Sequence, residues 1–150
     1  MIRAFAVVAL CLALGLAQAK APGTEAAIQG LLDEMAAAWN RGDAAALASH
    51  VQKDISFTVL DGSVFEGRDV FESKHRGLFA GAFKGTTMAF KARRVKLLHP
   101  DVAIVDVDTS LSGAGREPLR TSLLLVLKKD SREWLIAAFH NTARRSLVAE

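Results

Sequence analysis

The first third of the chain carries apolar residues with the period of an α-helix. They recur at i, i+3, i+4, i+7, i+8 and i+11, on Ile28, Leu31, Leu32, Met35, Ala36 and Trp39. This spacing predicts an amphipathic helix that begins with Thr24 as its N-cap and ends at Gly42. Asp43 can cap a second, short helix that reaches about His50.

The next segment combines a small hairpin with a third helix. Residues 55–60 alternate like a strand, Asp61-Gly62 is a turn signal, and residues 64–66 return along the first strand. Gly67 interrupts this pattern. A helix is predicted from residue 68 to residue 79, where apolar side chains again recur at helical spacing.

Two longer strands follow, over about residues 88–97 and 102–111. In the first, the apolar positions change parity at Arg93-Arg94, which predicts a β-bulge that bends the strand. In the second, valines at 105 and 107 oppose Asp106 and Asp108. We interpret these two carboxylates as part of an ordinary solvated face.

The last two strands are predicted over residues 119–128 and 134–142. The sequence thus orders three helices and a hairpin before a four-strand antiparallel meander, which predicts an α+β fold with a bent sheet wrapped over the long first helix. Residues 123–127 are all apolar, so neither face of that strand is expected to be wet. A partner over the outer face would cover them, and we therefore expect a homodimer.

Residues 1–19 have the pattern of a cleavable signal peptide. Met1-Ile2-Arg3 is a short positive start, residues 4–16 are apolar without charge, and Ala17-Gln18-Ala19 is an A-x-A cleavage site. The apolar run is shorter than the roughly 20 residues of a membrane-spanning helix. We expect cleavage after Ala19 to leave one periplasmic or secreted domain over residues 20–150, not associated with the membrane.

Removal of the signal peptide changes which chemistries are open to the chain. Cys11 is the only cysteine and is removed, so the mature chain can form no disulfide, thiolate nucleophile or Cys-ligated metal site. Arg3 is removed too, which leaves 18 of the 19 Lys and Arg residues against 16 Asp and Glu. This mild and scattered charge does not indicate nucleic-acid binding.

The final strand ends in the polar triplet His140-Asn141-Thr142 after a run of apolar residues. Strict alternation would send Trp134 and His140 to one face, and Asn141 to the other. On either face, a row of apolar side chains would then end in a side chain that can form hydrogen bonds. Small-molecule pockets are lined in this way. The alternative interpretation is a half-exposed histidine satisfied by a backbone carbonyl.

Short motifs spread over about residues 25–142 have the order and spacing of a known family. They are Ala38-Trp39-Asn40-Arg41-Gly42-Asp43, Gly67-Arg68, His75, Leu98-His99-Pro100-Asp101-Val102-Ala103, Arg120 with Leu125-Val126-Leu127, and Trp134 with Ala138-Phe139-His140-Asn141-Thr142. With these motifs the chain resembles the nuclear transport factor 2-like superfamily, in its SnoaL-like group and closest to the SgcJ/EcaC subfamily.

The resemblance implies a cone-shaped half-barrel of mixed or antiparallel strands, open at one end, with an apolar interior pocket and dimerisation through the outer sheet. Such proteins include cyclases, steroid isomerases, dehydratases and hydrolases, and also non-catalytic binding domains, so the fold does not decide the chemistry. SgcJ/EcaC members are often described as oxidoreductases. This chain has no dinucleotide fingerprint, metal triad or redox cysteine, and we expect neither a cofactor nor a metal.

His75 and His140 occupy family positions and are the candidate proton carriers, because histidine titrates near neutral pH. The expected walls of the shared pocket are Trp39, Phe57 and Phe79, and the expected polar groups are Arg120, Asn141 and Thr142. The chain has no tyrosine, which argues against a ketosteroid isomerase-type oxyanion donor. Two hypotheses remain: an acid/base enzyme for a small, largely apolar carbonyl compound, or a non-catalytic ligand-binding or dimerisation domain.

Overall fold

Six strands form one mixed sheet in the order β2-β1-β6-β5-β4-β3 in a computed structural model that describes residues 23–144. The predicted signal peptide and its cleavage site lie outside the described residues. The helices are α1 (Thr24–Asn40), α2 (Ala44–Ser49) and α3 (Arg68–Ala80). The strands are β1 (Val51–Thr58), β2 (Val64–Glu66), β3 (Thr86–His99), β4 (Val102–Gly113), β5 (Leu119–Asp130) and β6 (Glu133–Ala143).

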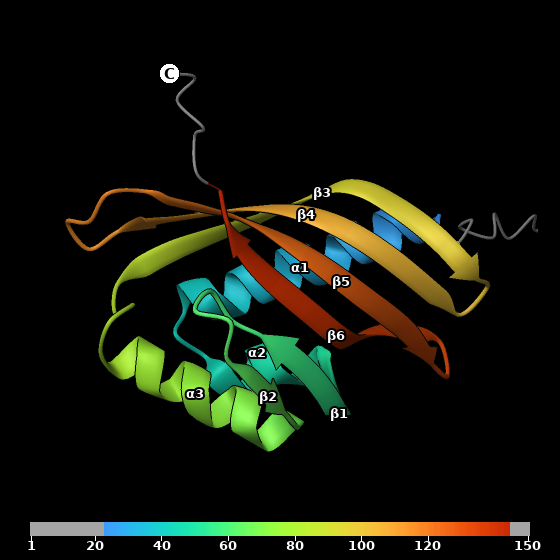
Figure 1. Cartoon of the computed structure of the whole chain (residues 1–150), viewed down its shortest axis with the longest axis horizontal. Helices are drawn as coiled ribbons and strands as arrows, with labels where there is room; N and C mark the ends of the chain where they lie inside the picture. Colours follow the sequence, from blue (N-terminus) through green and yellow to red (C-terminus); the bar gives the residue numbers. More distant parts are fainter. Residues whose placement is uncertain (1–22, 145–150) are drawn as a thin grey trace, which may run out of the picture.

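The α+β class and the antiparallel meander from β3 to β6 are confirmed (Figure 1). β1 extends the sheet beyond the β6 edge of the meander by pairing with β6 in parallel, and β2 pairs antiparallel with β1. β1 begins at Val51, before the predicted start at Ile55, because Val51 is completely buried and pairs with Ile136. The polar residues between Val51 and Ile55 conceal this start in the sequence.

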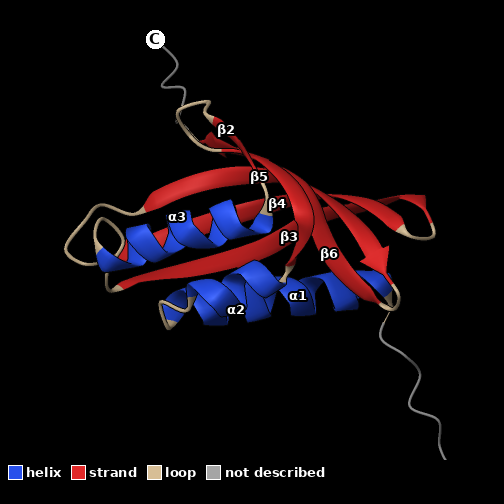
Figure 2. Cartoon of the chain, turned by 90° about the horizontal axis from the view of Figure 1, so that it is seen from below, coloured by secondary structure: helices blue, strands red, loops and turns tan. Residues whose placement is uncertain are grey.

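The helices gather on the concave side of the sheet, with α1 against β3 and α3 against β1 and β2 (Figure 2). The apolar stripe of α1 is buried as predicted, except that Ala36 is partly exposed and Ala38 is buried instead. Thr24 is the first helical residue and not the N-cap, which is Gly23 without a side-chain cap bond. The predicted cap of α2 is confirmed, since the Asp43 carboxylate accepts a hydrogen bond of 2.9 Å from the backbone N–H of Ala46.

Besides a register shift at Leu98 near the end of β3, two bulges bend the strands of the meander. The first is the predicted one: Ala92 pairs with Val107 and Arg94 with Asp106, so Arg93 is the extra residue of β3. The second lies in β6, where Ile136 pairs with Leu127 but Ala138 pairs with Val126, which leaves Ala137 over. A bulge reverses which side chains face the core, and the second bulge therefore decides what the end of β6 presents to the interior.

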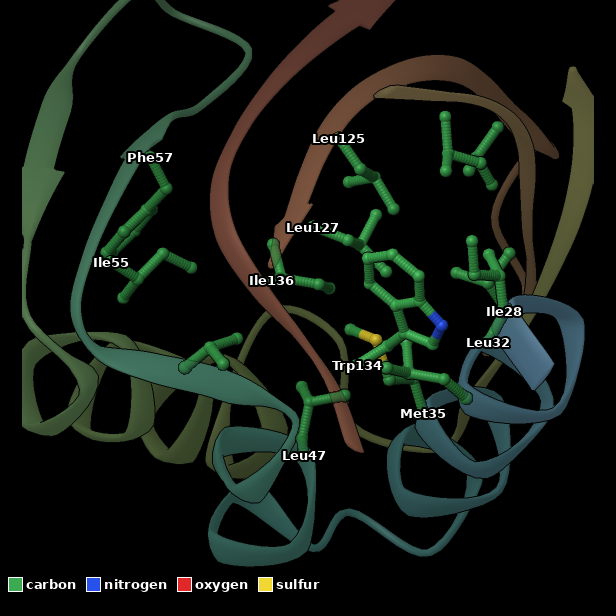
Figure 3. Packing of buried hydrophobic residues seen from close by; sticks show 14 of the residues in the cluster. Ile28, Leu32, Met35, Leu47, Ile55, Phe57, Leu125, Leu127, Trp134 and Ile136 are labelled. Carbon is green, nitrogen blue, oxygen red and sulfur yellow. The ribbon is translucent and has the colours of Figure 1, made fainter. Parts of the chain in front are cut away.

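The solid part of the core lies between α1 and the first half of β6. The buried Trp134 indole packs beside Leu32 and Met35 of α1 and near Leu127 of β5 (Figure 3). Phe57 and Ile55 of β1 extend this core on the other side of β6. Aromatic and aliphatic side chains of this size dominate the hydrophobic contribution to stability.

The outer face of the sheet is partly charged and partly apolar. Asp106 and Asp108 lie on it as predicted; the Asp106 carboxylate is 2.7 Å from Arg94 Nε and that of Asp108 is 3.1 Å from Arg144 Nη1. Leu124 of β5 is 44% exposed there in the single chain. Among residues 23–144, no helix is long and apolar enough to cross a membrane.

Candidate functional site

A cavity of about 560 Å³ opens between the concave face of the sheet, α1 and α3. Its walls are almost entirely apolar. They include Leu32, Met35 and Trp39 from α1, Phe71 from α3, Phe57 from β1, and Met88, Leu111, Leu125 and Phe139 from the sheet. A concave apolar space of this size is typical of sites for small molecules.

The mouth of the cavity is marked by the lining residues that are exposed. These are Leu60 and Asp61 in the turn after β1, and Lys74 and Gly77 on α3. The Asp61 carboxylate accepts a hydrogen bond of 2.8 Å from the backbone N–H of Ser63, and this bond is the main reason why the pKa of Asp61 is lowered. Lys74 Nζ lies 3.5 Å from the centroid of the Phe65 ring.

His75 is the titratable group deepest in the cavity wall. Its ring centroid lies 4.1 Å from that of Phe71 and 5.9 Å from that of Trp39. Nδ1 lies 2.7 Å from the Phe71 carbonyl oxygen. Because a carbonyl can only accept, Nδ1 carries the proton and donates it, which leaves Nε2 as an acceptor with no hydrogen-bond partner among residues 23–144.

The same burial fixes the charge of His75. Removal from water lowers the pKa of His75 below its ordinary value of 6.5, and the hydrogen bond to Phe71 opposes this effect only in part. Burial has this direction for any cationic group, because the charged form loses its hydration. His75 is therefore a neutral imidazole at pH 7, able to accept a proton or a hydrogen bond at Nε2.

The ring of Trp39 lines the cavity, while its indole N–H forms a hydrogen bond with a residue outside the lining. The indole N–H donates to the Thr86 hydroxyl at 3.2 Å, and that hydroxyl donates to the Phe83 carbonyl at 2.7 Å. Phe79 packs edge-on against Trp39, with ring centroids 5.0 Å apart. Phe79 is not a lining residue, so its predicted place on the wall is wrong: it supports the Trp39 ring instead.

The polar part of the cavity floor consists of Thr109, Thr121 and Asn141. The two threonine hydroxyls are 2.6 Å apart and buried. Asn141 Oδ1 is buried without a hydrogen-bond partner among the described residues. Sequence reasoning missed both threonines, although the alternation of β4 places Thr109 on the same face as Val105 and Val107.

His140 and Thr142 do not belong to the cavity, contrary to the prediction. The bulge at Ala137 shifts the parity of β6, so that Phe139 and Asn141 line the cavity and the residues between them and beyond point away. His140 is exposed on the outer face, opposite Leu124 and beside Thr58. The predicted convergence of His75 and His140 in one site is wrong.

Arg120 also lies outside the cavity. Its neighbours Leu119 and Thr121 line the cavity, and the alternation of β5 therefore turns Arg120 to the outer face, where it is exposed. Of the predicted site residues, the cavity brings together His75, Trp39, Phe57 and Asn141. Within residues 23–144, no three His, Cys, Asp or Glu side chains come together as a metal site would require.

The curled mixed sheet, the helices on its concave side and the apolar cavity between them define a nuclear transport factor 2-like fold. A SnoaL-like domain model matches residues 28–143, and the chain belongs to the SnoaL-like domain family. No curated protein matches the chain.

Several solved structures share this fold. One is a domain of unknown function with a cystatin-like fold from Nostoc punctiforme, at 25% identity and a TM-score of 0.75, over 82% of this chain and 78% of that one. Another is an NTF-2 like protein of unknown function from Shewanella oneidensis, at 20% identity and a TM-score of 0.71, over 78% and 97%. A ketosteroid isomerase-like protein from Erwinia carotovora atroseptica is 19% identical, with a TM-score of 0.67, over 81% and 97%.

Proposed function

We propose that this SnoaL-like domain binds a small, largely apolar molecule in the cavity between the sheet and α3. The observation that carries the proposal is an apolar cavity of about 560 Å³ that also contains polar atoms free to bond to a guest, Asn141 Oδ1 and His75 Nε2. Apolar walls supply the affinity, and a few such atoms fix the orientation.

The experiment introduces a bulky side chain into the cavity at one residue. A control variant carries the same side chain at a neighbouring residue on the opposite face of the sheet. Met88 lines the cavity, whereas Ala89 is exposed on the outer face of the same strand. N-phenyl-1-naphthylamine, a neutral dye that fluoresces in apolar surroundings, is the probe. We expect Met88→Trp to weaken dye binding at least about tenfold, because the indole occupies the space, and Ala89→Trp to leave it unchanged. Equal binding by both variants, or no binding by the native chain, contradicts the proposal.

Acid/base catalysis by His75 is a second candidate, favoured by the state of its ring. A neutral imidazole with Nδ1 held by a backbone carbonyl and Nε2 free is the form that a general base requires. A carbonyl compound bound beside it could lose a proton from the carbon next to the carbonyl to Nε2. The ketosteroid isomerase-like name of a structure with the same fold agrees with this class of reaction.

Deuterium exchange tests the catalytic candidate without knowledge of the natural substrate. The probe is 2-tetralone in deuterated water, whose α-hydrogens exchange when a base removes them. We expect the native chain to accelerate this exchange and His75→Phe to lose at least about 100-fold of the acceleration, since general-base contributions have this size. His140→Phe is the control, because His140 lies on the outer face. If both variants exchange like the native chain, the cavity only binds.

We also propose that the protein is a homodimer that associates through the outer face of the sheet. The exposure of Leu124 on that face, within an apolar strand, supports this assembly. A contiguous apolar patch on an outer face marks a surface where proteins associate, and the proposed partner would cover Leu124 there. Light scattering should give twice the chain mass at micromolar concentration, and Leu124→Glu should give the monomer. A native chain that is monomeric contradicts the assembly.

We also propose a cellular location and a subfamily for the chain. We propose that the chain is exported to the periplasm or beyond after cleavage at Ala19, on the strength of its N-terminal pattern. The SgcJ/EcaC placement rests on the motifs given above. N-terminal sequencing of the exported protein should begin at Lys20, and a sequence that begins at Met1 contradicts the cleavage.

A further inference from the structure

The cavity floor carries a small polar group of side chains on three neighbouring strands. Thr109 of β4 pairs with Thr121 of β5, and Asn141 of β6 pairs with Leu123, two residues along from Thr121. All of these side chains line the cavity. Diagonal neighbours on one face of two paired strands lie about 7–8 Å apart, so a ligand group placed between Thr121 and Asn141 can contact both. The threonines and the asparagine therefore form one polar subsite, which we call the Thr-Asn floor.

The hydrogen bonds within the Thr-Asn floor do not satisfy all of its members. The two threonine hydroxyls share one hydrogen bond of 2.6 Å, which uses one of their two protons. The second proton remains available to an acceptor. Asn141 Oδ1 is a buried acceptor without a donor among the described residues. The floor thus presents a free threonine proton and a free acceptor, Asn141 Oδ1, beside the N–H groups of the Asn141 amide.

We propose that the Thr-Asn floor recognises a hydroxyl group on the apolar ligand. A hydroxyl donates one hydrogen bond and accepts another, so one such group can donate to Asn141 Oδ1 and accept from the threonine pair. An ether or carbonyl oxygen can only accept and leaves Asn141 Oδ1 unpaired. A buried acceptor without its partner is costly, which makes the missing donor a basis for discrimination. This proposal rests on the proposed binding function.

The test uses two probes that differ in this one donor, 2-naphthol and its methyl ether. Calorimetric titration of the native chain should give about tenfold tighter binding for the naphthol, the size expected when a buried acceptor gains or loses its donor. Asn141→Leu should abolish that preference while the ether still binds, since leucine keeps the volume of the side chain. Because the ether is larger by a methyl group, the change of preference between native and variant chains is the decisive quantity.

Thr142→Val is the matched control, because Thr142 is exposed on the outer face and follows Asn141 directly. It should keep the naphthol preference of the native chain. A second variant, Thr109→Val with Thr121→Val, removes both hydroxyls at constant shape and should also reduce the preference. Thermal unfolding of each variant verifies that it is folded, and the double variant decides if Asn141→Leu does not fold.

The outcomes separate the two proposals. If the naphthol and the ether bind the native chain equally, or if Asn141→Leu and the double variant both retain the preference, the hydroxyl subsite is overturned while apolar binding stands. If neither probe nor the phenylnaphthylamine dye binds, the binding function fails as well. If the preference is present and is lost in the floor variants alone, the subsite is established.

Discussion

The two halves of β6 face the same interior, but one half fills it with side chains and the other half borders an open cavity. The first half inserts Trp134 and Ile136 into the core beside α1, where both are buried, and only Ile136 of the two also reaches the cavity wall. The second half presents Phe139 and Asn141 to an open cavity. The extra residue Ala137 separates the halves. One bulge thus marks the change from a region where side chains fill the interior to a region that leaves open space and an unpaired polar atom, where the proposed ligand would bind.

The division also explains why polar side chains occur in only one of the halves. Around Trp134 the neighbouring side chains of the core cluster are apolar, and the polar atom that this residue contributes is its own indole N–H. Beyond the bulge, Asn141 lines the cavity together with Thr109 of β4 and Thr121 of β5. Buried polar atoms without a hydrogen-bond partner are uncommon in folded proteins, and Asn141 Oδ1 is one that faces the cavity.

Deletion of Ala137 should have the largest effect, because it removes the bulge that separates the two halves of β6. Without the extra residue, the end of β6 must either turn Phe139 and Asn141 outward or break its pairing with β5. Both outcomes expose Phe139 or lose sheet hydrogen bonds. We expect the variant to lose its cooperative transition in urea-induced unfolding. Ala137→Ser keeps the residue count and is the control; a deletion variant as stable as the native chain would contradict the role of the bulge.

Truncation within the filled half should come next in size. Trp134→Ala removes a buried indole that packs against α1, and core truncations of this kind cost about 3–5 kcal/mol of unfolding free energy. Phe139→Ala removes an aromatic ring from the cavity wall, where one side already faces open space, and should cost less. Urea denaturation of both variants measures the difference. An equal loss at the two positions would show that the cavity half is packed like the core.

The sequence predicts a bulge only where polar residues show which positions of the strand face outward. The bulge at Arg93 is predicted because apolar and charged positions alternate visibly on both sides of it. The bulge at Ala137 is hidden, because every residue from 135 to 139 is apolar and either face could be the inner one. That hidden bulge is why His140 and Thr142 were expected in the cavity and lie outside it.

The helical half of the site is predicted more completely. Trp39 closes the apolar stripe of α1, and His75 lies on the apolar side of α3, so helical period alone directs both toward the sheet. Phe79 shares that side but packs on Trp39, a detail of packing that spacing does not contain. The Thr-Asn floor needs strand register as well as alternation, and register is set by three-dimensional pairing.

A pH effect of intermediate size should distinguish the imidazole in the cavity wall from the rest of the molecule. Burial lowers the pKa of His75 in the folded chain, so the unfolded chain binds more protons as the pH falls below about 6.5. Folding stability is then complete above that pH and decreases below it, until the folded pKa is reached. The slope from one histidine is at most about 1.4 kcal/mol per pH unit.

His50 contributes in the same direction, because burial also lowers its pKa despite the nearby Glu34 carboxylate. The measurement therefore compares unfolding free energies at pH 7 and pH 5 for the native chain, His75→Phe and His50→Phe. Each variant should remove part of the loss at low pH. If His75→Phe shows the full native loss, His75 is not a buried neutral imidazole and its candidacy as a base fails with it.

Asn141→Leu should have the smallest effect, and the opposite sign. In the ligand-free chain Asn141 Oδ1 is buried without a partner among residues 23–144, so replacement by an apolar side chain of similar volume removes a desolvation cost. We expect unfolding free energy to rise by about 1 kcal/mol in the absence of ligand, measured by urea denaturation. A saturating hydroxyl ligand should reverse this order, because a ligand stabilises the chain that binds it more tightly. A loss of more than about 2 kcal/mol without ligand would mean that Asn141 anchors the end of β6, and that the two halves of the strand both serve stability.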